Sequence, residues 1–95
     1  MTKRLLVEVS GRVQLVMYRD FARRRALIRN VFGTVQNLEN GNVSIIAEGE
    51  EENLNLFLSD LKNGPIFAKV TNVDTKWLPS TGEFKEFSII FYVKN

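Results

Sequence analysis

Residues 3–30, KRLLVEVSGRVQLVMYRDFARRRALIRN, decide the fold, because the pattern changes within them from that of a strand to that of a helix. Lys3–Arg12 alternates, with aliphatic side chains on one face and polar ones on the other, which predicts a β-strand. Arg19–Asn30 is rich in Arg, Ala and Leu, which favour helices. Asn30 suits the left-handed conformation that often ends a helix. The stretch therefore predicts a strand, a short loop and a helix.

Working outward, the rest of the chain adds four strand patterns and one helix. The expected strands are Gly33–Glu39, Val43–Glu48, Ala68–Trp77 and Phe87–Val93. Asn40-Gly41 predicts a hairpin between the first two of them, because both residues accept positive φ. The second helix is expected to begin at Glu50-Glu51-Glu52, to bury Leu54, Phe57, Leu58 and Leu61, and to end at Lys62-Asn63-Gly64-Pro65. Residues 78–82 are expected to form a loop.

The order of these elements is that of the split βαβ pattern. We therefore predict an α+β, ferredoxin-like sandwich in which an antiparallel sheet of four to five strands carries two helices on one face. The 95 residues are enough for one domain and too few for two, so residues 1–95 are assigned to a single domain.

Two segments depart from a regular pattern. The apolar phase of strand 68–77 slips between Val70 and Val73, which indicates a β-bulge or a strand end. In the first helix, Arg25 and Arg29 interrupt the expected apolar face of Phe21, Ala22 and Ile28. Their aliphatic stems are expected to cover the edge of the core while the guanidinium groups remain in water.

The composition excludes several kinds of chemistry and partner. With no cysteine and no histidine, the chain has no disulfide framework, no thiolate nucleophile and no histidine base. A net charge of +2 does not indicate nucleic-acid binding, although residues 19–29 carry five arginines against one aspartate. No apolar run approaches the roughly 18 residues of a membrane span, and no signal peptide is evident. A cytoplasmic monomer with neither a membrane nor a nucleic-acid partner is expected.

The loop before the first helix is the candidate site. A loop that leads into a helix exposes backbone N–H groups that have no partner within the helix, and the helix dipole adds positive potential there. Such a site suits an anion, and Arg19 in the first turn would add a two-pronged donor for phosphate oxygens. An ordinary strand-to-helix connection with a surface arginine is equally consistent with these residues.

Two motifs extend the argument. Gly11-x-Val13-Gln14-Leu15-Val16-x-Tyr18-Arg19 resembles the acylphosphatase pattern G-x-V-Q-G-V-x-F-R. The second motif of that family is similar to Gly33-x-Val35-x-Asn37-x-x-x-Gly41-x-Val43, which Ala47-Glu48-Gly49 follows. Gly64-Pro65 and Phe84-x-x-Phe87-x-Ile89 also look like the family, so the resemblance covers nearly the whole chain.

The resemblance implies hydrolysis of small acyl phosphates to a carboxylate and inorganic phosphate. It implies that Arg19 grips the phosphate and that Asn37 positions the attacking water. It also implies a phosphate cradle made by the backbone amides of the loop, namely those of Gln14, Leu15, Val16, Met17, Tyr18 and Arg19. No metal and no cofactor are expected, and the partners are an acyl phosphate and inorganic phosphate.

Leu15 departs from the family pattern, because it replaces a glycine in the middle of the expected cradle. If φ is positive there, a leucine costs roughly 1–2 kcal/mol or the loop takes another shape. If φ is ordinary, Leu15 is harmless or crowds the acyl group. A phosphate-binding module without turnover is therefore the alternative. Arg29, at a usually apolar position, could loosen the packing of the helix.

The element order and the last strand each suggest one further function. Split βαβ domains can bind RNA on the open sheet face, but this requires aromatic residues on adjacent central strands, and here they cluster in the last strand. Self-association through that last strand is the other, because Ile90 and Tyr92 alternate with Ile89 and Phe91 and make both of its faces apolar.

Overall fold

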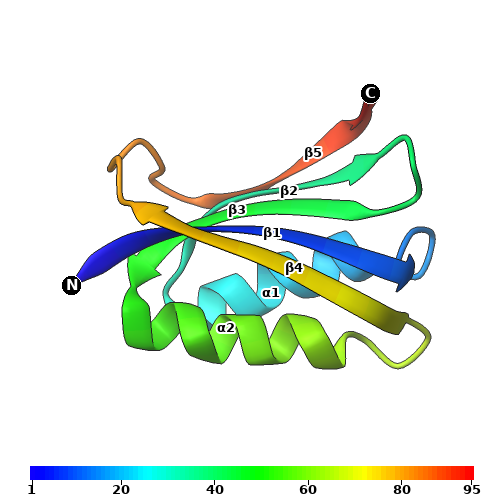
Figure 1. Ribbon diagram of the computed structural model, residues 1–95, viewed down its shortest axis with the longest axis horizontal. Helices are drawn as coiled ribbons and strands as arrows, with labels where there is room; N and C mark the ends of the chain where they lie inside the picture. The colour runs from blue at the N-terminus through cyan, green and yellow to red at the C-terminus, as the bar shows by residue number, and fades with distance from the viewer.

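A computed structural model describes all 95 residues as one five-stranded sheet with two helices packed against one of its faces (Figure 1). The strands are β1 (Thr2–Arg12), β2 (Phe32–Leu38), β3 (Val43–Glu50), β4 (Lys69–Pro79) and β5 (Phe87–Lys94). The helices are α1 (Tyr18–Arg29) and α2 (Glu51–Asn63). Neither helix is long and apolar enough to cross a lipid bilayer. The predicted α+β sandwich with both helices on one face is confirmed.

The sheet has the order β4-β1-β3-β2-β5 and differs from a fully antiparallel one at one edge. Three of its pairings are antiparallel, as expected, but β5 runs parallel to β2. The reason is the connection of residues 80–86, which leaves β4 at one edge and crosses the end of the sheet to the other edge (Figure 1). It arrives where β2 begins, and β5 then follows β2 in the same direction.

The core lies between the sheet and the helices. The alternation of apolar residues in the strands and the apolar stripe of the second helix predict its position correctly. On the sheet, the alternating aliphatic residues of β1 and β3 are buried, and α2 contributes Leu54, Phe57 and Leu61. On α1, Ala22 and Ala26 are buried, whereas Ile28 is exposed. The expectation for Ile28 was therefore wrong: small residues face the sheet and let α1 approach it closely.

The arginines that interrupt the apolar face of α1 join it to α2. Arg25 Nε donates to Asp60 of α2 at 3.0 Å, and Arg29 donates to both oxygens of the same carboxylate at 2.8 and 3.0 Å. The expectation that the guanidinium groups remain in water is therefore wrong, because both are paired with a carboxylate. Burial by itself raises the pKa of Asp60, but the bonds from Arg29 and Arg25 outweigh it and lower that pKa.

Replacing Asp60 by asparagine is expected to lower the free energy of unfolding by about 1–3 kcal/mol, because two partly buried arginines lose their anionic partner. Urea unfolding at neutral pH measures it. Asp20→Asn is the matched control, since Asp20 pairs only with its own helix, through Arg23 and Arg24, and its loss costs about 0.5 kcal/mol. Equal effects of the two substitutions would contradict the assignment of Asp60 as the tie between the helices.

Several local predictions can be compared with the backbone. The bulge is confirmed: Ser10 pairs with Asn72 and Gly11 with Val70, so β4 has one extra residue. Gly11 lies in that irregular ladder with φ 119°, and a Cβ there would stand 2.1 Å from the Lys69 carbonyl oxygen. It is therefore needed for close strand approach and is not a simple turn glycine.

Three element boundaries also differ or are refined. β4 continues through Leu78 and Pro79, which had been assigned to a loop, because they pair with β1. Glu50 ends β3 and precedes α2 instead of lying in its first turn. Asn30 caps α1 in the left-handed region (φ 57°), as predicted.

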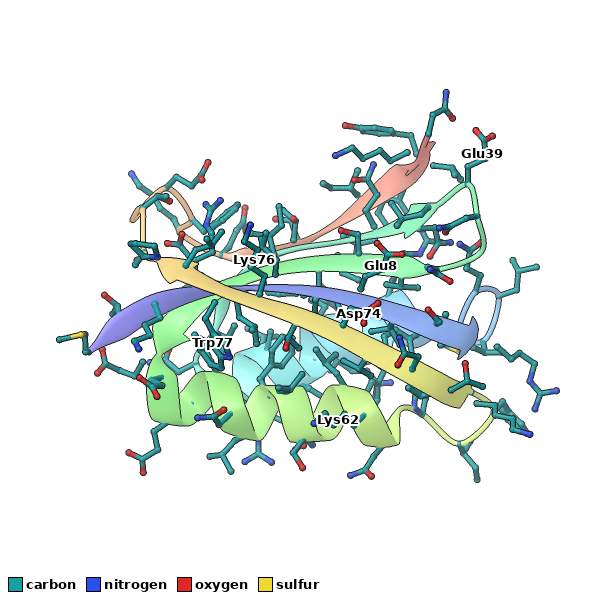
Figure 2. All side chains as sticks on the ribbon, viewed as in Figure 1. Glu8, Glu39, Lys62, Asp74, Lys76 and Trp77 are labelled. Carbon is teal, nitrogen blue, oxygen red and sulfur yellow. The ribbon has the colours of Figure 1, made fainter.

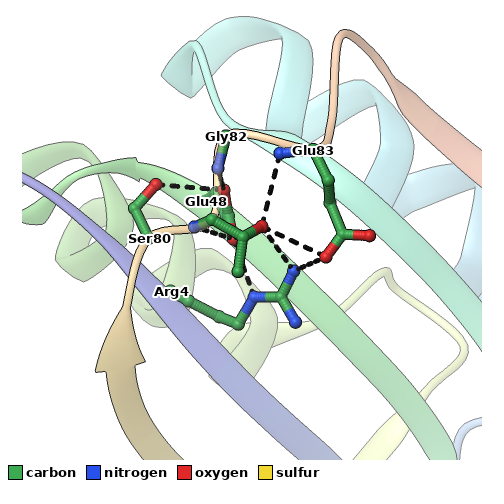
Figure 3. Close-up of polar contacts among 6 residues, drawn as sticks. Arg4, Glu48, Ser80, Gly82 and Glu83 are labelled. Carbon is green, nitrogen blue, oxygen red and sulfur yellow. Dashed lines mark hydrogen bonds and ion pairs between the residues drawn. The ribbon is translucent and has the colours of Figure 1, made fainter.

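The connection between β4 and β5 is held by one buried carboxylate (Figure 3). Glu48 of β3 is 4% exposed and accepts hydrogen bonds from Arg4 Nε at 2.7 Å and from Ser80 Oγ at 3.0 Å. It also accepts from the amides of Thr81 and Gly82, both at 3.0 Å, and from the Thr81 hydroxyl at 2.9 Å. Arg4 in turn pairs with Glu83. These bonds fix the crossing segment, and with it the start of β5.

The opposite face of the sheet is uncovered and polar near its centre. Glu8 on β1 stands opposite Asp74 on β4, with Lys76 two residues further along the same strand (Figure 2). Two neighbouring carboxylates repel a phosphate backbone, and the exposed Phe91 and Tyr92 lie on β5 at the sheet edge rather than on central strands. Near its centre this face therefore presents two carboxylates, and the exposed aromatic residues of β5 lie at an edge of the sheet.

Candidate functional site

The loop between β1 and α1 has an unusual backbone. Leu15 and Met17 both have positive φ, 61° and 63°, with Val16 between them outside that region. Alternation of left-handed and ordinary residues turns successive N–H groups toward one side and forms a concave anion-binding "nest". Leu15 thus takes the conformation for which glycine is usually needed, at a conformational cost of roughly 1–2 kcal/mol.

The amides of this loop are free to bind a ligand. The first N–H group of α1 that has a backbone acceptor is that of Phe21, which donates to the Met17 carbonyl, and the N–H groups of residues 15–20 donate no hydrogen bond within the protein. The residue that precedes α1 is Met17, whose side chain makes no capping hydrogen bond. The positive end of α1 is therefore open to an anion.

Arg19 is the one arginine of α1 that has no carboxylate partner. Arg23, Arg24, Arg25 and Arg29 all pair with Asp20 or Asp60. The Arg19 guanidinium instead lies 5.5 Å from the centre of the Phe91 ring, with one long contact of 3.5 Å to the Ile90 carbonyl. An aromatic ring beside it restrains the side chain without neutralising it, so its charge and most of its donors remain available.

Asn37 reaches the same region from β2. The pairing of β2 with β5 is irregular here, since Gln36 pairs with Ile90 but Leu38 with Lys94. Asn37 shares the phase of the buried Val35, so it points to the helix side of the sheet. Its side chain is 6% exposed, and its Oδ1 atom is buried with no hydrogen-bond partner. A buried amide oxygen without a donor indicates a place for a water or ligand group.

A pocket of about 280 Å³ joins these parts. Of the residues predicted for the site, it is lined by Leu15, Met17, Tyr18, Arg19 and Asn37. The remaining lining residues are Val13, Asp20, Ile89 and Phe91. Phe91, which the sequence places on an apolar face of the last strand, is 76% exposed and lies beside Arg19. The parallel pairing of β5, which brings Phe91 here, has no local sequence signal.

Three of the predicted site residues support the loop with their side chains, and only Tyr18 among them also lines the pocket. Gln14 Nε2 donates to the carbonyls of Leu38 and Asn42, both at 2.8 Å, and so ties the loop to the β2–β3 hairpin. Val16 packs against the core. The Tyr18 hydroxyl donates to the Leu61 carbonyl oxygen at 2.7 Å, and burial raises the pKa of Tyr18.

Fold and site together define an α+β domain in which the backbone amides of one loop, at a helix N-terminus, have no partner within the protein. Residues 5–89 match the sequence model of one family, Acylphosphatase. The chain is 42% identical over 91 residues to the acylphosphatase of Clostridium acetobutylicum, covering 96% of this chain and 100% of that protein. The identity to the acylphosphatase of Thermus thermophilus is 46% over 79 residues, 83% of this chain and 90% of that one.

A solved structure agrees with these sequence matches. The crystal structure of acylphosphatase from Bacillus subtilis superposes with a TM-score of 0.90 at 38% identity, over 95% of this chain and 99% of that one. The chain therefore belongs to the acylphosphatase family, hydrolases that act on acid anhydrides.

Proposed function

We propose that this chain hydrolyses acyl phosphates, with the phosphate held by the amides of residues 14–19 and by Arg19, and with the attacking water positioned by Asn37. The observation that carries the proposal is the convergence in one pocket of an unpaired guanidinium, a run of free amides and a buried amide oxygen without a donor. Each of these groups lacks a partner that a phosphate or a water would supply.

In the proposed reaction, the water oxygen forms a bond to phosphorus while the bond from phosphorus to the acyl oxygen breaks. The carboxylate leaves, and the proton of the water passes to a phosphate oxygen of the substrate, so no histidine or other protein base is required. Charge develops on the phosphoryl oxygens, where Arg19 and the loop amides stabilise it. Asn37 contributes by holding the water in line, which is a gain from orientation.

The conformation of Leu15 bears on whether turnover occurs. With φ 61° it keeps the left-handed geometry that a glycine would adopt, and its side chain is 98% exposed rather than folded into the cradle. This supports an active site over a phosphate-binding module without turnover. Leu15→Gly separates the two, because a site disabled only by Leu15 gains activity with glycine, whereas a working site is already active with leucine.

Asn37→Ala is expected to lower kcat for benzoyl phosphate by about 10²–10³-fold while phosphate still binds, because the loop and Arg19 are unchanged. The measurement pairs a hydrolysis assay with calorimetric titration of inorganic phosphate. Gln36→Ala is the neighbouring control, since Gln36 bonds only to the Tyr92 carbonyl and lies on the other face of β2. If Asn37→Ala kept kcat and weakened phosphate binding instead, Asn37 would be a phosphate ligand and not a water-positioning residue.

A further inference from the structure

Leu15 and Met17 have an unfavourable backbone conformation, and their side chains make no contact with the core that would offset it. Both are left-handed, with φ 61° and 63°, and their side chains are 98% and 70% exposed. Neither belongs to the hydrophobic core or packs against it. Backbone strain that no internal contact offsets is found mainly at binding sites, and here both residues line the pocket of Arg19 and Asn37.

The pocket has two chemically different parts. Its polar part contains Arg19 and Asn37, the groups suited to a phosphate and a water, and Asp20, whose carboxylate is paired with Arg23 and Arg24. Its remaining lining is mainly apolar, and the three most exposed members, Leu15, Met17 and Phe91, come from the loop and from β5. When the phosphate lies on the loop amides, the acyl group attached to it must extend out of the pocket alongside these side chains.

We propose that Leu15, together with Met17 and Phe91, forms an apolar wall that contacts the acyl group and makes this chain select acyl phosphates with a bulky apolar acyl group. Leu15 is its main specificity-determining residue, because it replaces a hydrogen by four carbons at the mouth of the cradle. The inference rests on the proposed function and names the substrate class of that site. Contact with one leucine side chain is worth about tenfold in discrimination.

The test compares kcat/KM for benzoyl phosphate with kcat/KM for acetyl phosphate in the same protein. Taking this ratio in each variant relative to the wild type cancels the different intrinsic reactivities of the two anhydrides. The variants are Leu15→Gly, which removes the side chain, and Leu15→Gln, which keeps a side chain of similar bulk but makes its end polar. Ile66→Gly is the matched control, because Ile66 is an 89% exposed loop residue outside the pocket.

We expect the benzoyl-to-acetyl ratio to fall about tenfold in Leu15→Gly, to fall also in Leu15→Gln, and to stay unchanged in Ile66→Gly. An unchanged ratio in an active Leu15→Gly protein overturns the inference and leaves the proposed function standing. The inference is also overturned if the benzoyl-to-acetyl ratio falls in Leu15→Gly but equals the wild-type ratio in Leu15→Gln. Side-chain bulk, and not apolar contact, would then be responsible for the selection.

A binding experiment keeps the two proposals separable if the wild type hydrolyses neither substrate. Benzylphosphonate and methylphosphonate, which cannot be hydrolysed as anhydrides, are titrated calorimetrically into the wild type and Leu15→Gly. Tighter binding of benzylphosphonate that weakens about tenfold in Leu15→Gly supports the apolar wall while the hydrolase assignment fails. Equal affinities for the two phosphonates, or no binding of either, overturn the wall.

Discussion

Arg19→Ala is expected to lower kcat/KM for benzoyl phosphate by at least about a thousandfold, the largest functional effect of any single substitution in the chain. The guanidinium is the only positive side chain in the pocket, and no carboxylate neutralises it. In the fold it makes one long contact to the Ile90 carbonyl and lies beside the Phe91 ring. Its removal should therefore cost less than about 1 kcal/mol of stability, so activity and folding can be separated.

The planar shape of the Arg19 guanidinium is expected to contribute to activity in addition to its charge. Arg19→Lys keeps the positive charge but loses the planar fork that matches two phosphate oxygens, so an intermediate loss of about 10²-fold is expected. Arg24→Ala is the control, since Arg24 lies on the same helix, is well exposed and pairs with Asp20. Steady-state hydrolysis and circular dichroism of the three variants measure both effects. If Arg19→Ala retained a tenth of wild-type kcat/KM, Arg19 would not be the main phosphate ligand.

The sequence predicted those parts of the fold that depend on local pattern. The alternation in β1, the stripe Leu54–Phe57–Leu61 and the cap at Asn30 all express contacts or dihedral preferences within a few residues. The phase slip between Val70 and Val73 likewise reports the bulge opposite Ser10 and Gly11. Such signals are strong because each residue is in its preferred local conformation.

The local sequence pattern does not predict features that depend on pairing between segments far apart in the chain. The direction of β5 is set by the path of residues 80–86, and the same path places Phe91 beside Arg19. Arg29 was interpreted as a defect of α1, because its partner Asp60 lies 31 residues away on α2. Ile28, judged from its helical wheel alone, was assigned to the core, although the sheet contacts the alanine side of the helix.

For the candidate site, the sequence indicated the loop, Arg19 and Asn37, and these residues do meet in one pocket. It left the dihedral angle of Leu15 open, because a leucine has no local signal for positive φ. The buried cluster around Glu48 was missed for a different reason. Its ligands are two backbone amides and two hydroxyls of the connection after β4, together with Arg4 of β1, and no spacing in the sequence relates them.

Glu48→Gln is expected to cause the largest loss of stability, about 3–5 kcal/mol at neutral pH, because it leaves Arg4 without its buried anion and sets an amide group against donors of the 80–82 segment. Burial alone raises the pKa of Glu48, but the hydrogen bonds from the Thr81 amide, Arg4, the Thr81 hydroxyl and the Gly82 amide outweigh it and lower the pKa to about 2 from 4.5. The side chain is 5% exposed, so solvent screens these bonds little.

The lowered pKa gives this stabilisation a definite dependence on pH. A carboxylate whose pKa is lower in the folded state contributes its full stabilisation above the unfolded pKa, near 4.5, and loses it as the pH falls toward 2. The full contribution is about 3 kcal/mol, and about half of it remains at a pH of about 3. The difference in unfolding free energy between wild type and Glu48→Gln should therefore narrow by about half between neutral pH and a pH of about 3.

Urea unfolding at the two pH values measures this difference, and Glu83→Gln serves as the control. Glu83 also pairs with Arg4, but it is 57% exposed, so its loss should cost below about 1 kcal/mol. If the difference in unfolding free energy between wild type and Glu48→Gln did not change with pH, packing and not the charge of Glu48 would stabilise the 80–86 connection. Because that connection determines where β5 begins and how Phe91 reaches Arg19, Glu48→Gln should also weaken hydrolysis indirectly, through a site that is less ordered at the β5 edge.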